Sequence, residues 1–410
     1  MTWLWALCLT QMGTILVFLN FAGALPLVKT AWGISYAQAG AIQAATQVGY
    51  LLFVPILSSL TDFVPPERLL IGGALGAAIA NLAFAVFAAN VASAILLRMA
   101  VGIGVAAIYM PGVKVITQRL PEAQRGRAMG LFVASFTVGS ATSVALGGNL
   151  AATLGWRMAL GLMSLGPMLG ALAAWLVART AVPAGASSLV VPGGEARYSL
   201  RALLHNHTTL LVIVTYAAHV WELFGLRTWL PAFLTAVFVY RGIDLAPATQ
   251  YGADVAGLAT LLGALSIVVA AALSDRIGRT TTIIVISTVG FSCTMALGFM
   301  LTWPQSLVII AALVTTLLAT ADSAVISTTL TETVPQTYLG RTLALYSFSG
   351  FLAGSLSPLV FGAVQDITGE TWRWAFASLA AGGLTALAGA TLLRRRLPAA
   401  LITVHSAKSS

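Results

Sequence analysis

Three ionisable side chains fall within nine residues of one strongly apolar stretch: His219, Glu222 and Arg227. His219 and Glu222 are three residues apart, so they are neighbours on a helix. Tyr216 precedes Arg227 by eleven residues, close to three whole turns, so these two share a side. The four side chains cover an arc of about 140° at 100° per residue. Because histidine exchanges protons near neutral pH, this face predicts a proton carrier, His219 or Glu222, beside an anion contact.

Exposing ionisable side chains of this kind to lipid costs free energy, so we expect this face to line a central, water-filled cavity. Tyr216, His219 and Arg227 are then candidate substrate-binding residues, and His219 and Glu222 are candidate coupling residues. Gly225 and Pro231 would let the outer end of the helix bend. The structural alternative is a buried Glu222–Arg227 ion pair that only holds the helix in place.

Arg98 lies near the start of an earlier apolar run, at 92–117. A charge at the centre of a membrane helix costs about 2.5–3.5 kcal/mol on insertion scales, so Arg98 should face a cavity or a partner. Tyr109 lies eleven residues further on and shares its face in a regular helix. We predict that Arg98 and Tyr109 bind substrate and that Arg98 takes part in coupling. The alternative for Arg98 is a tether to a neighbouring helix.

Other polar residues in apolar runs carry weaker predictions. Lys114 is expected to extend its side chain toward the membrane surface, with a cytoplasmic gate as the alternative. Asp322 is expected to pair with a base or with backbone groups. Asn20 is one of several polar residues, with Gln43, Gln47 and Tyr50, that are candidates for lining a cavity.

The elements that position these residues must be membrane helices. Only 8% of the residues are charged and 59% are hydrophobic, whereas soluble domains carry about 25% charged residues. A spanning helix needs roughly 20 apolar residues, so the 410 residues accommodate twelve spans with short loops. The fold class is therefore an all-α membrane protein. The apolar runs lie at 3–25, 37–60, 69–90, 92–117, 127–153, 155–179, 209–237, 251–273, 280–302, 304–330, 341–365 and 371–394.

The domain organisation follows from the one long hydrophilic stretch, which is rich in Pro, Gly and Ser. We predict an N-terminal six-helix half over 1–179, a cytoplasmic linker over 180–208, a C-terminal half over 209–394 and a cytoplasmic tail over 395–410. With both termini inside, fourteen loop and tail Lys or Arg residues are cytoplasmic and four are outside. This bias predicts a multi-pass inner-membrane protein with both termini in the cytoplasm.

The two halves repeat one another at a nearly constant offset. Three pairs of residues match at equivalent span ends, at offsets of 213, 214 and 216: Asp62 with Asp275, Arg127 with Arg341, and Trp156 with Trp372. The matches predict two pseudo-symmetric halves derived from one duplicated unit. Parallel repeats of this kind place the substrate site between the halves near the middle of the membrane.

On these motifs the chain resembles the major facilitator superfamily over essentially its whole length. The loop signature of that family is present in LSDRIGR, which holds Asp275, Arg276 and Arg279. Its first-half counterpart, LTDFVPPER, is degraded and keeps Asp62 and Arg68. The resemblance implies that these five residues act in gating.

Two further patterns bear on the subfamily. Arg98 begins RMAVGIGVAA, and in relatives this arginine is linked to proton coupling. Gly130, Gly139 and Gly147 are spaced as in the exporter signature, but Ser143 and Val144 replace its Gly-Pro pair. That departure counts against a drug/proton antiporter. The seventh span loosely resembles cyanate- and nitrate-type porters.

We therefore expect a secondary active transporter that moves a small, anionic solute by alternating access, by symport or antiport, with protons as the candidate coupling ion. The alternative is a proton-coupled exporter of drugs or metabolites, and a third hypothesis is a transporter-like sensor. The sequence lacks a Walker pattern, its basic residues are scattered, and Cys8 and Cys293 form no metal or disulfide framework. We thus expect no enzyme activity, no cofactor, no metal and no nucleic-acid partner. The expected state is a monomer in the lipid bilayer.

Overall fold

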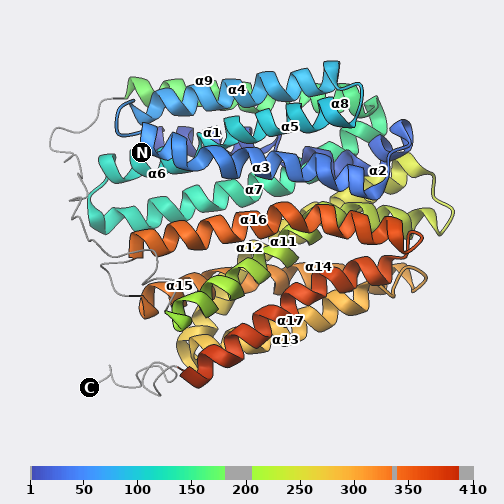
Figure 1. Cartoon of the computed structure of the whole chain (residues 1–410). Coiled ribbons are helices and arrows are strands. Elements are labelled where there is room, and N and C mark those ends of the chain that lie inside the picture. Colours follow the sequence, from blue (N-terminus) through green and yellow to red (C-terminus); the bar gives the residue numbers. More distant parts are fainter. Residues whose placement is uncertain (1, 181–205, 335–338, 397–410) are drawn as a thin grey trace. The chain divides into compact units, whose positions relative to one another are not determined.

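The computed structural model describes residues 2–180, 206–334 and 339–396. Most of the predicted linker and tail therefore lies outside the described residues. Within them the chain is almost entirely helical (Figure 1). The helices are α1 (Thr2–Ile15), α2 (Asn20–Trp32), α3 (Tyr36–Leu60), α4 (Pro66–Phe87), α5 (Val91–Ala106), α6 (Tyr109–Arg119), α7 (Glu122–Leu154), α8 (Trp156–Leu162), α9 (Leu165–Arg179), α11 (His207–Val239), α12 (Leu245–Ile277), α13 (Arg279–Leu297), α14 (Gln305–Ala321), α15 (Ser323–Thr333), α16 (Leu339–Ile367) and α17 (Trp372–Arg396).

Twelve candidate membrane spans are found among the described residues, as the sequence predicts. Four of them consist of two consecutive helices: α1 with α2, α5 with α6, α8 with α9, and α14 with α15. The break between α5 and α6 comes just before Pro111, whose ring nitrogen has no hydrogen for the carbonyl four residues earlier. The seventh span, α11, is one continuous helix that contains Gly225 and Pro231.

The described chain divides into two compact units. One comprises α1 to α9 together with Arg227–Leu261, and the other comprises the rest. In the first unit, α3 packs against α5 through glycine: a Cβ on Gly102 would lie 1.9 Å from the Thr46 carbonyl oxygen. Only glycine permits this approach of two backbones, which is frequent between membrane helices.

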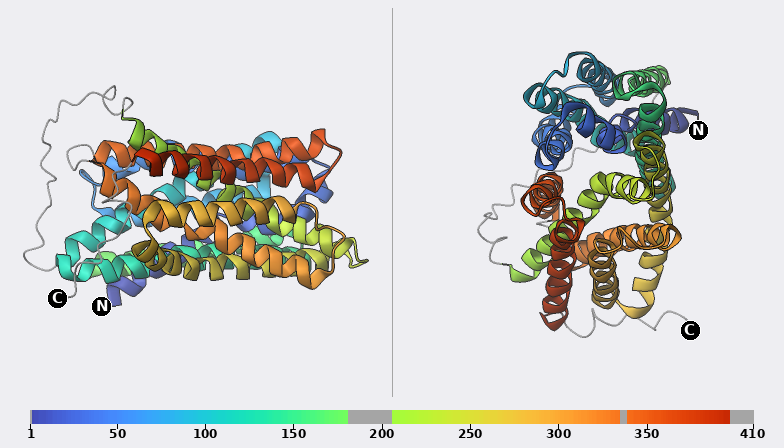
Figure 2. Two further views of the ribbon diagram at one scale, coloured as in Figure 1. Left: turned by 90° about the horizontal axis from the view of Figure 1, so that it is seen from below. Right: turned by 90° about the vertical axis from the view of Figure 1, so that its right-hand side faces the viewer.

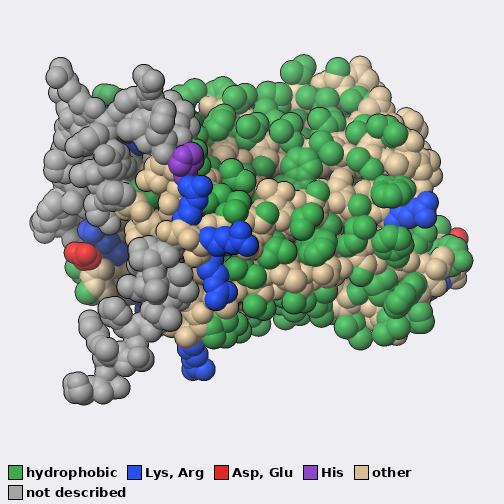
Figure 3. Space-filling model, turned by 60° about the horizontal axis from the view of Figure 1, so that its bottom comes forward, with side chains coloured by type: hydrophobic (Ala, Val, Ile, Leu, Met, Phe, Trp, Pro, Cys, Tyr) green, Lys and Arg blue, Asp and Glu red, His purple; other side chains and the backbone are tan. Residues whose placement is uncertain are grey.

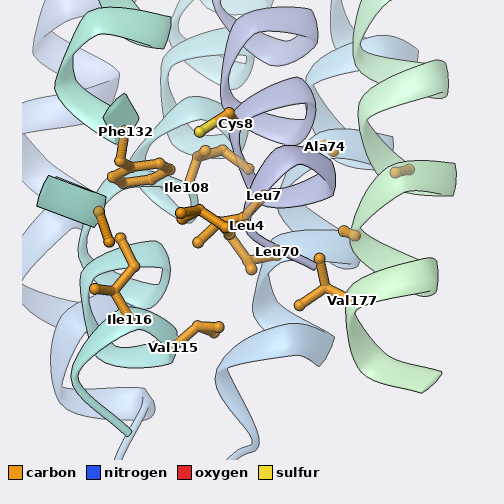
Figure 4. Packing of buried hydrophobic residues seen from close by; sticks show 13 residues of the cluster. Leu4, Leu7, Cys8, Leu70, Ala74, Ile108, Val115, Ile116, Phe132 and Val177 are labelled. Carbon is orange, nitrogen blue, oxygen red and sulfur yellow. The ribbon is translucent and has the colours of Figure 1, made fainter. Parts of the chain in front are cut away.

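An apolar core fills the first unit beside this helix pair. Leu7, Leu70, Ile116, Phe132 and Val177 belong to one cluster of buried side chains (Figure 4). They come from α1, α4, α6, α7 and α9, so one cluster joins five helices. In the end-on view of Figure 2, the helices of this unit are seen nearly along their axes.

The second unit has its own core, formed by side chains from α11 to α17. Val212, Ile286, Ile326, Tyr346 and Leu393 are among its buried members. The polar residues of the seventh span that drew attention in the sequence lie within this unit, up to Leu226. Their immediate neighbours are therefore side chains of α13 to α17.

The surface is apolar, as a lipid-facing protein requires. Hydrophobic side chains cover most of the face in Figure 3. Large side chains such as Ile79 and Val268, each 69% exposed, stand on the outside of spanning helices. An apolar exposure of this extent is incompatible with a monomer in water. The structure thus confirms an all-α, multi-pass membrane protein.

Candidate functional site

His219 lies at the centre of a buried polar cluster in the second unit. Its Nδ1 atom is 2.7 Å from Oδ1 of Asp322, and both side chains are almost wholly buried. Its Nε2 atom is 2.8 Å from the hydroxyl of Ser323. Asp322 occupies the break between α14 and α15, and Ser323 is the first residue of α15. Both ring nitrogens of His219 therefore contact polar atoms at a break in the tenth span.

Hydroxyl side chains explain part of this break. Thr316, Thr320 and Ser323 each donate a hydrogen bond to a carbonyl three or four residues earlier in the chain. Such bonds compete with the amide donors of the helix and bend it. Helix α14 therefore ends one residue before Asp322, and the Asp322 carboxylate lies beside the His219 imidazole.

Glu222 forms the second polar contact of α11. One of its carboxylate oxygens accepts a short hydrogen bond from the Thr294 hydroxyl on α13. The other oxygen lies beside Gly383 of α17, where a Cβ would stand 2.8 Å away. Glu222 is thus held between α13 and α17, whereas His219 faces α14 and α15.

Aromatic rings cover His219 on its cytoplasmic side in the predicted topology. The Tyr216 and Tyr346 rings stack with centroids 3.6 Å apart, and Tyr216 is also roughly parallel to the His219 ring at 6.1 Å. The Tyr346 hydroxyl is 2.9 Å from that of Ser327. The aromatic pair therefore lies next to the imidazole.

The polar face of α11 differs from our expectation in one respect. His219 and Glu222 are 4% and 6% exposed, and both contact side chains of other helices in their unit. They do not line an open, water-filled cavity in this conformation. Arg227 is half-buried further along α11.

Arg98 lies in a separate network, in the first unit. Its guanidinium donates to the Val17 carbonyl at 3.1 Å and to Asn20 Oδ1 at 2.8 Å, and it lies over the rings of Phe21 and Phe84. The Asn20 amide donates in turn to Asn81. These contacts join α5, α2 and α4, which supports the tether that the sequence left open.

Asn81 anchors this network to a fourth element. Its side-chain amide donates to the Leu160 carbonyl at 2.6 Å and to the Ser164 hydroxyl at 2.9 Å. Ser164 lies between α8 and α9, at the break of the sixth span. Arg98 is fully buried and connected through two asparagines to that break.

Tyr109 is not brought together with Arg98. The expected alignment assumed one regular helix, but the fourth span breaks at 107–108, so the three-turn spacing does not apply. The Tyr109 ring stacks on Phe132 of α7, with centroids 5.8 Å apart. The two residues therefore face different neighbours.

The second-half loop signature forms a compact ionic cluster. Arg279 at the start of α13 pairs with Asp275 at the end of α12 and with Glu332 near the end of α15. It also donates to the Ser274 hydroxyl. Arg276 is exposed. Two of the three predicted gating residues are thus joined, through Glu332, to the tenth span.

The degraded first-half signature is connected differently. Asp62 pairs with Lys114 of α6 at 2.8 Å, and Lys114 also donates to the Thr61 carbonyl. Lys114 therefore reaches the loop that follows α3, where the Asp62 side chain is exposed, in agreement with the side chain extended toward the surface that the sequence favoured. Arg68 is exposed at the start of α4.

A buried ion pair beside this loop was not predicted. Glu67 at the start of α4 accepts from Arg119 at the end of α6, at 2.7 Å, and the Arg119 side chain is only 2% exposed. The pair occupies nearly the same place in its half as Arg279 and Glu332 do in theirs, with the charges exchanged. The spacings of 52 and 53 residues are the signal that would have revealed it.

Residues 7–253 and 236–408 match the family model of the Major Facilitator Superfamily. The chain belongs to this family. The protein named "Probable sulfoacetate transporter SauU" of Cupriavidus necator is 26% identical over 289 residues, which are 67% of this chain and 65% of that protein. A gallate transporter of Pseudomonas putida is 26% identical over 303 residues, with the same two shares.

The chain thus matches just under two thirds of the length of these curated relatives. Among solved structures, an inward-facing bacterial homologue of the human lysosomal transporter Spinster has a TM-score of 0.74 at 17% identity, over 96% of both chains. A D-xylose-proton symporter has a TM-score of 0.72 at 16% identity, over 95% of this chain and 97% of that one. The structures share the fold, and both of the curated relatives above are named as transporters.

Proposed function

We propose that this protein is a proton-coupled secondary transporter of a small organic anion in the inner membrane, with both termini in the cytoplasm. The observation that carries the proposal is the group of His219, Glu222 and Asp322, three ionisable side chains buried on spanning helices. Such groups are rare inside membranes and mark ion pathways and proton relays. A structural role alone needs no titratable group at a helix break.

The anionic substrate is supported by the two relatives named for sulfoacetate and gallate, which both carry a carboxylate. Arg227, on the same helix as the ionisable group, is the residue proposed to bind this carboxylate. Arginine presents a planar fork that matches a carboxylate, whereas lysine does not. Arg98 is assigned to the tether, because its guanidinium is buried against Val17 and Asn20.

The test is uptake of labelled sulfoacetate and labelled gallate into proteoliposomes with an imposed pH gradient. We expect uptake of at least one anion that depends on the gradient. Arg227→Lys should lower the affinity at least tenfold, about 1.4 kcal/mol, while the protein still inserts. The double variant Arg227→Ala with Glu222→Ala should stay inactive, because the anion donor is absent. A double variant that binds as the parent does would instead assign Arg227 to neutralising Glu222.

A drug exporter is the second candidate, since the multidrug resistance protein Stp of Mycobacterium tuberculosis is 26% identical over 160 residues. That match covers 38% of this chain and 30% of that protein. Thermal unfolding of the purified protein against a panel of anions and cationic drugs separates the two, because a bound ligand stabilises the folded state. Stabilisation by cationic drugs alone would contradict the anion proposal.

A further inference from the structure

A groove lies on the outside of the first unit, where α4 packs against α5 (Figure 1). It encloses about 580 Å³, within the range of about 300–1,000 Å³ that ligand pockets have. Aliphatic side chains such as Leu69, Ile79, Leu97 and Ile103 line it, and Arg68 is the one charged residue among the described residues of the lining. The groove is therefore apolar, with a base at the end where α4 begins.

Glycine forms the floor of this groove for two different reasons. Gly73 and Gly104 are required by packing, because a Cβ on Gly73 would lie 2.7 Å from the Gly104 carbonyl oxygen. Gly72 and Gly76 are not, because nothing lies within 4 Å of a Cβ at either position. A glycine inside a helix is less favourable than an alanine, so packing within the described chain does not account for these two residues. Their lack of a side chain keeps the groove open.

The groove is long enough for the acyl chain of a lipid. Its two ends on α4, Arg68 and Ala83, are fifteen residues apart, which is about 22 Å at 1.5 Å per residue. One leaflet contributes about 15 Å of hydrocarbon, half of the core thickness of about 30 Å. A chain that enters beside Arg68 can therefore follow the groove to the middle of the bilayer.

The protein leaves the charge at the entrance of the groove unbalanced. Asp62 pairs with Lys114 and Glu67 pairs with Arg119, so both acidic residues beside Arg68 are held by bases of α6. The Arg68 guanidinium is exposed and forms no hydrogen bond or ion pair with the part of the chain that the structure describes. An anion at this end of the groove would complete it.

We propose that the groove binds an anionic glycerophospholipid of the phosphatidylglycerol type, with one acyl chain along α4 and the phosphate at Arg68. Arginine can bind a phosphate through two parallel hydrogen bonds. A zwitterionic headgroup carries its own cation, which competes with Arg68 for the phosphate, so a net negative headgroup is favoured. The lipid belongs to the cytoplasmic leaflet in the proposed topology, and its binding does not depend on which solute is transported.

A second groove, near the opposite ends of the helices, offers a contrast. It is larger, about 690 Å³, and its lining includes Arg157. The Arg157 guanidinium, however, donates to the carbonyls of Ala85 and Ala88 at 2.9 and 2.8 Å. Because these donors are already used, we expect a lipid chain in this second groove to be held without preference for an anionic headgroup.

The test is native mass spectrometry of the purified full chain in detergent, with phosphatidylglycerol and phosphatidylcholine that carry identical acyl chains. One basic residue near a membrane surface favours an anionic lipid about fivefold, and we expect this preference for the first lipid bound. Arg68→Gln should remove the preference. The matched control is Arg127→Gln, which removes another exposed arginine of the same unit, at the start of α7, that does not line the groove; the preference should remain.

The acyl chain is tested by filling the groove. Gly76→Leu should lower the affinity for the first phosphatidylglycerol about tenfold, because the new side chain occupies the place of the lipid chain. Gly130→Leu is the matched control, since Gly130 is an exposed glycine of α7 with nothing within 4 Å of its Cβ position; this variant should bind as the parent does. If Gly76→Leu does not fold, Gly72→Leu fills the same groove.

Three results would overturn the proposal. The first is equal binding of the two lipids by the parent, a comparison that needs no variant. The second is an equal loss of preference in Arg68→Gln and Arg127→Gln, which would assign the effect to the overall positive charge. The third concerns inorganic phosphate, which should not raise the unfolding temperature of the parent; if it does so as much as phosphatidylglycerol, Arg68 binds a free anion and not a lipid. Since no arm measures transport, failure here leaves the proposed function untouched.

Discussion

The network around Arg98 makes a quantitative prediction about stability. Asn20→Ala removes the acceptor of a buried guanidinium and a bond to Asn81. Hydrogen bonds to charged groups contribute about 1.5–3 kcal/mol and neutral ones about 0.5–1.5 kcal/mol. The free energy of unfolding should therefore fall by about 2–4 kcal/mol. With an unfolding entropy of about 2.1 cal/mol/K per residue, a chain of 410 residues loses about 1 °C per kcal/mol, so the unfolding temperature should fall by about 2–5 °C.

The assay is thermal unfolding of the purified protein in detergent, followed by tryptophan fluorescence. Asn149→Ala is the matched control, because the Asn149 amide bonds the exposed carboxylate of Asp254. Exposed polar pairs contribute little, so this variant should change the free energy of unfolding by less than about 1 kcal/mol.

The reasoning would be refuted if Asn20→Ala unfolded like the control and instead lowered the affinity for the transported anion. That result would place Arg98 in the substrate site, as the sequence first suggested. If Asn20→Ala lowered both the free energy of unfolding and the affinity for the anion, loss of the network would still explain both effects. Distortion of α5 also changes the surrounding helices.

Three further predictions concern the gate, the aromatic stack and the topology. Asp275→Asn should slow transport more than it weakens substrate binding, because it removes one partner of the ionic cluster at the ends of α12 and α13; turnover and affinity are measured separately in proteoliposomes. Gly350→Ala should lower the free energy of unfolding by about 1–3 kcal/mol, because a Cβ would lie 2.3 Å from the Tyr216 ring. A cysteine at Phe63 should resist a membrane-impermeant thiol reagent in intact cells, whereas one at Thr302 should react.

Each of these predictions has a control and a contrary result. Arg276→Gln should affect turnover less than Asp275→Asn, and unchanged turnover in the latter would show that the loop signature is not used. Gly340→Ala should be neutral or stabilising, because nothing lies within 4 Å of its Cβ position; a similar loss at both glycines would exclude the ring contact as the cause. The cysteines are introduced after Cys8 and Cys293 are replaced by serine, and labelling in the reverse pattern would overturn the orientation.

The number of spans could be predicted from the sequence because bilayer thickness fixes the length of an apolar run. The breaks within spans could not, since a hydropathy window averages across one or two irregular residues. Pro111 in the first turn of α6 is a sequence signal for the break between α5 and α6, and this break removes the alignment of Arg98 with Tyr109. The break at Asp322 has no proline and depends on hydroxyl groups that also occur in regular helices.

The candidate site was found only in part for a related reason. His219 and Glu222 stand out because charged residues are costly in an apolar helix. Their partners Asp322 and Thr294 are distant in sequence, and which helices meet is decided by packing rather than by local pattern. The same limit explains Asn81, an ordinary polar residue in sequence that proves to connect Asn20 with Ser164.

The two equivalent ion pairs carry their charges in opposite order, which constrains how the halves arose and how they can be engineered. The first half pairs Glu67 with Arg119, and the second pairs Arg279 with Glu332. Two copies produced by a duplication begin with the same polarity. A pair cannot reverse by one substitution without placing two like charges together, which repel strongly where water is partly excluded. At least one half must therefore have passed through a neutral or unpaired ancestor. Replacing only one member of a pair by its counterpart from the other half would place two glutamates or two arginines together, so the two members must be exchanged together.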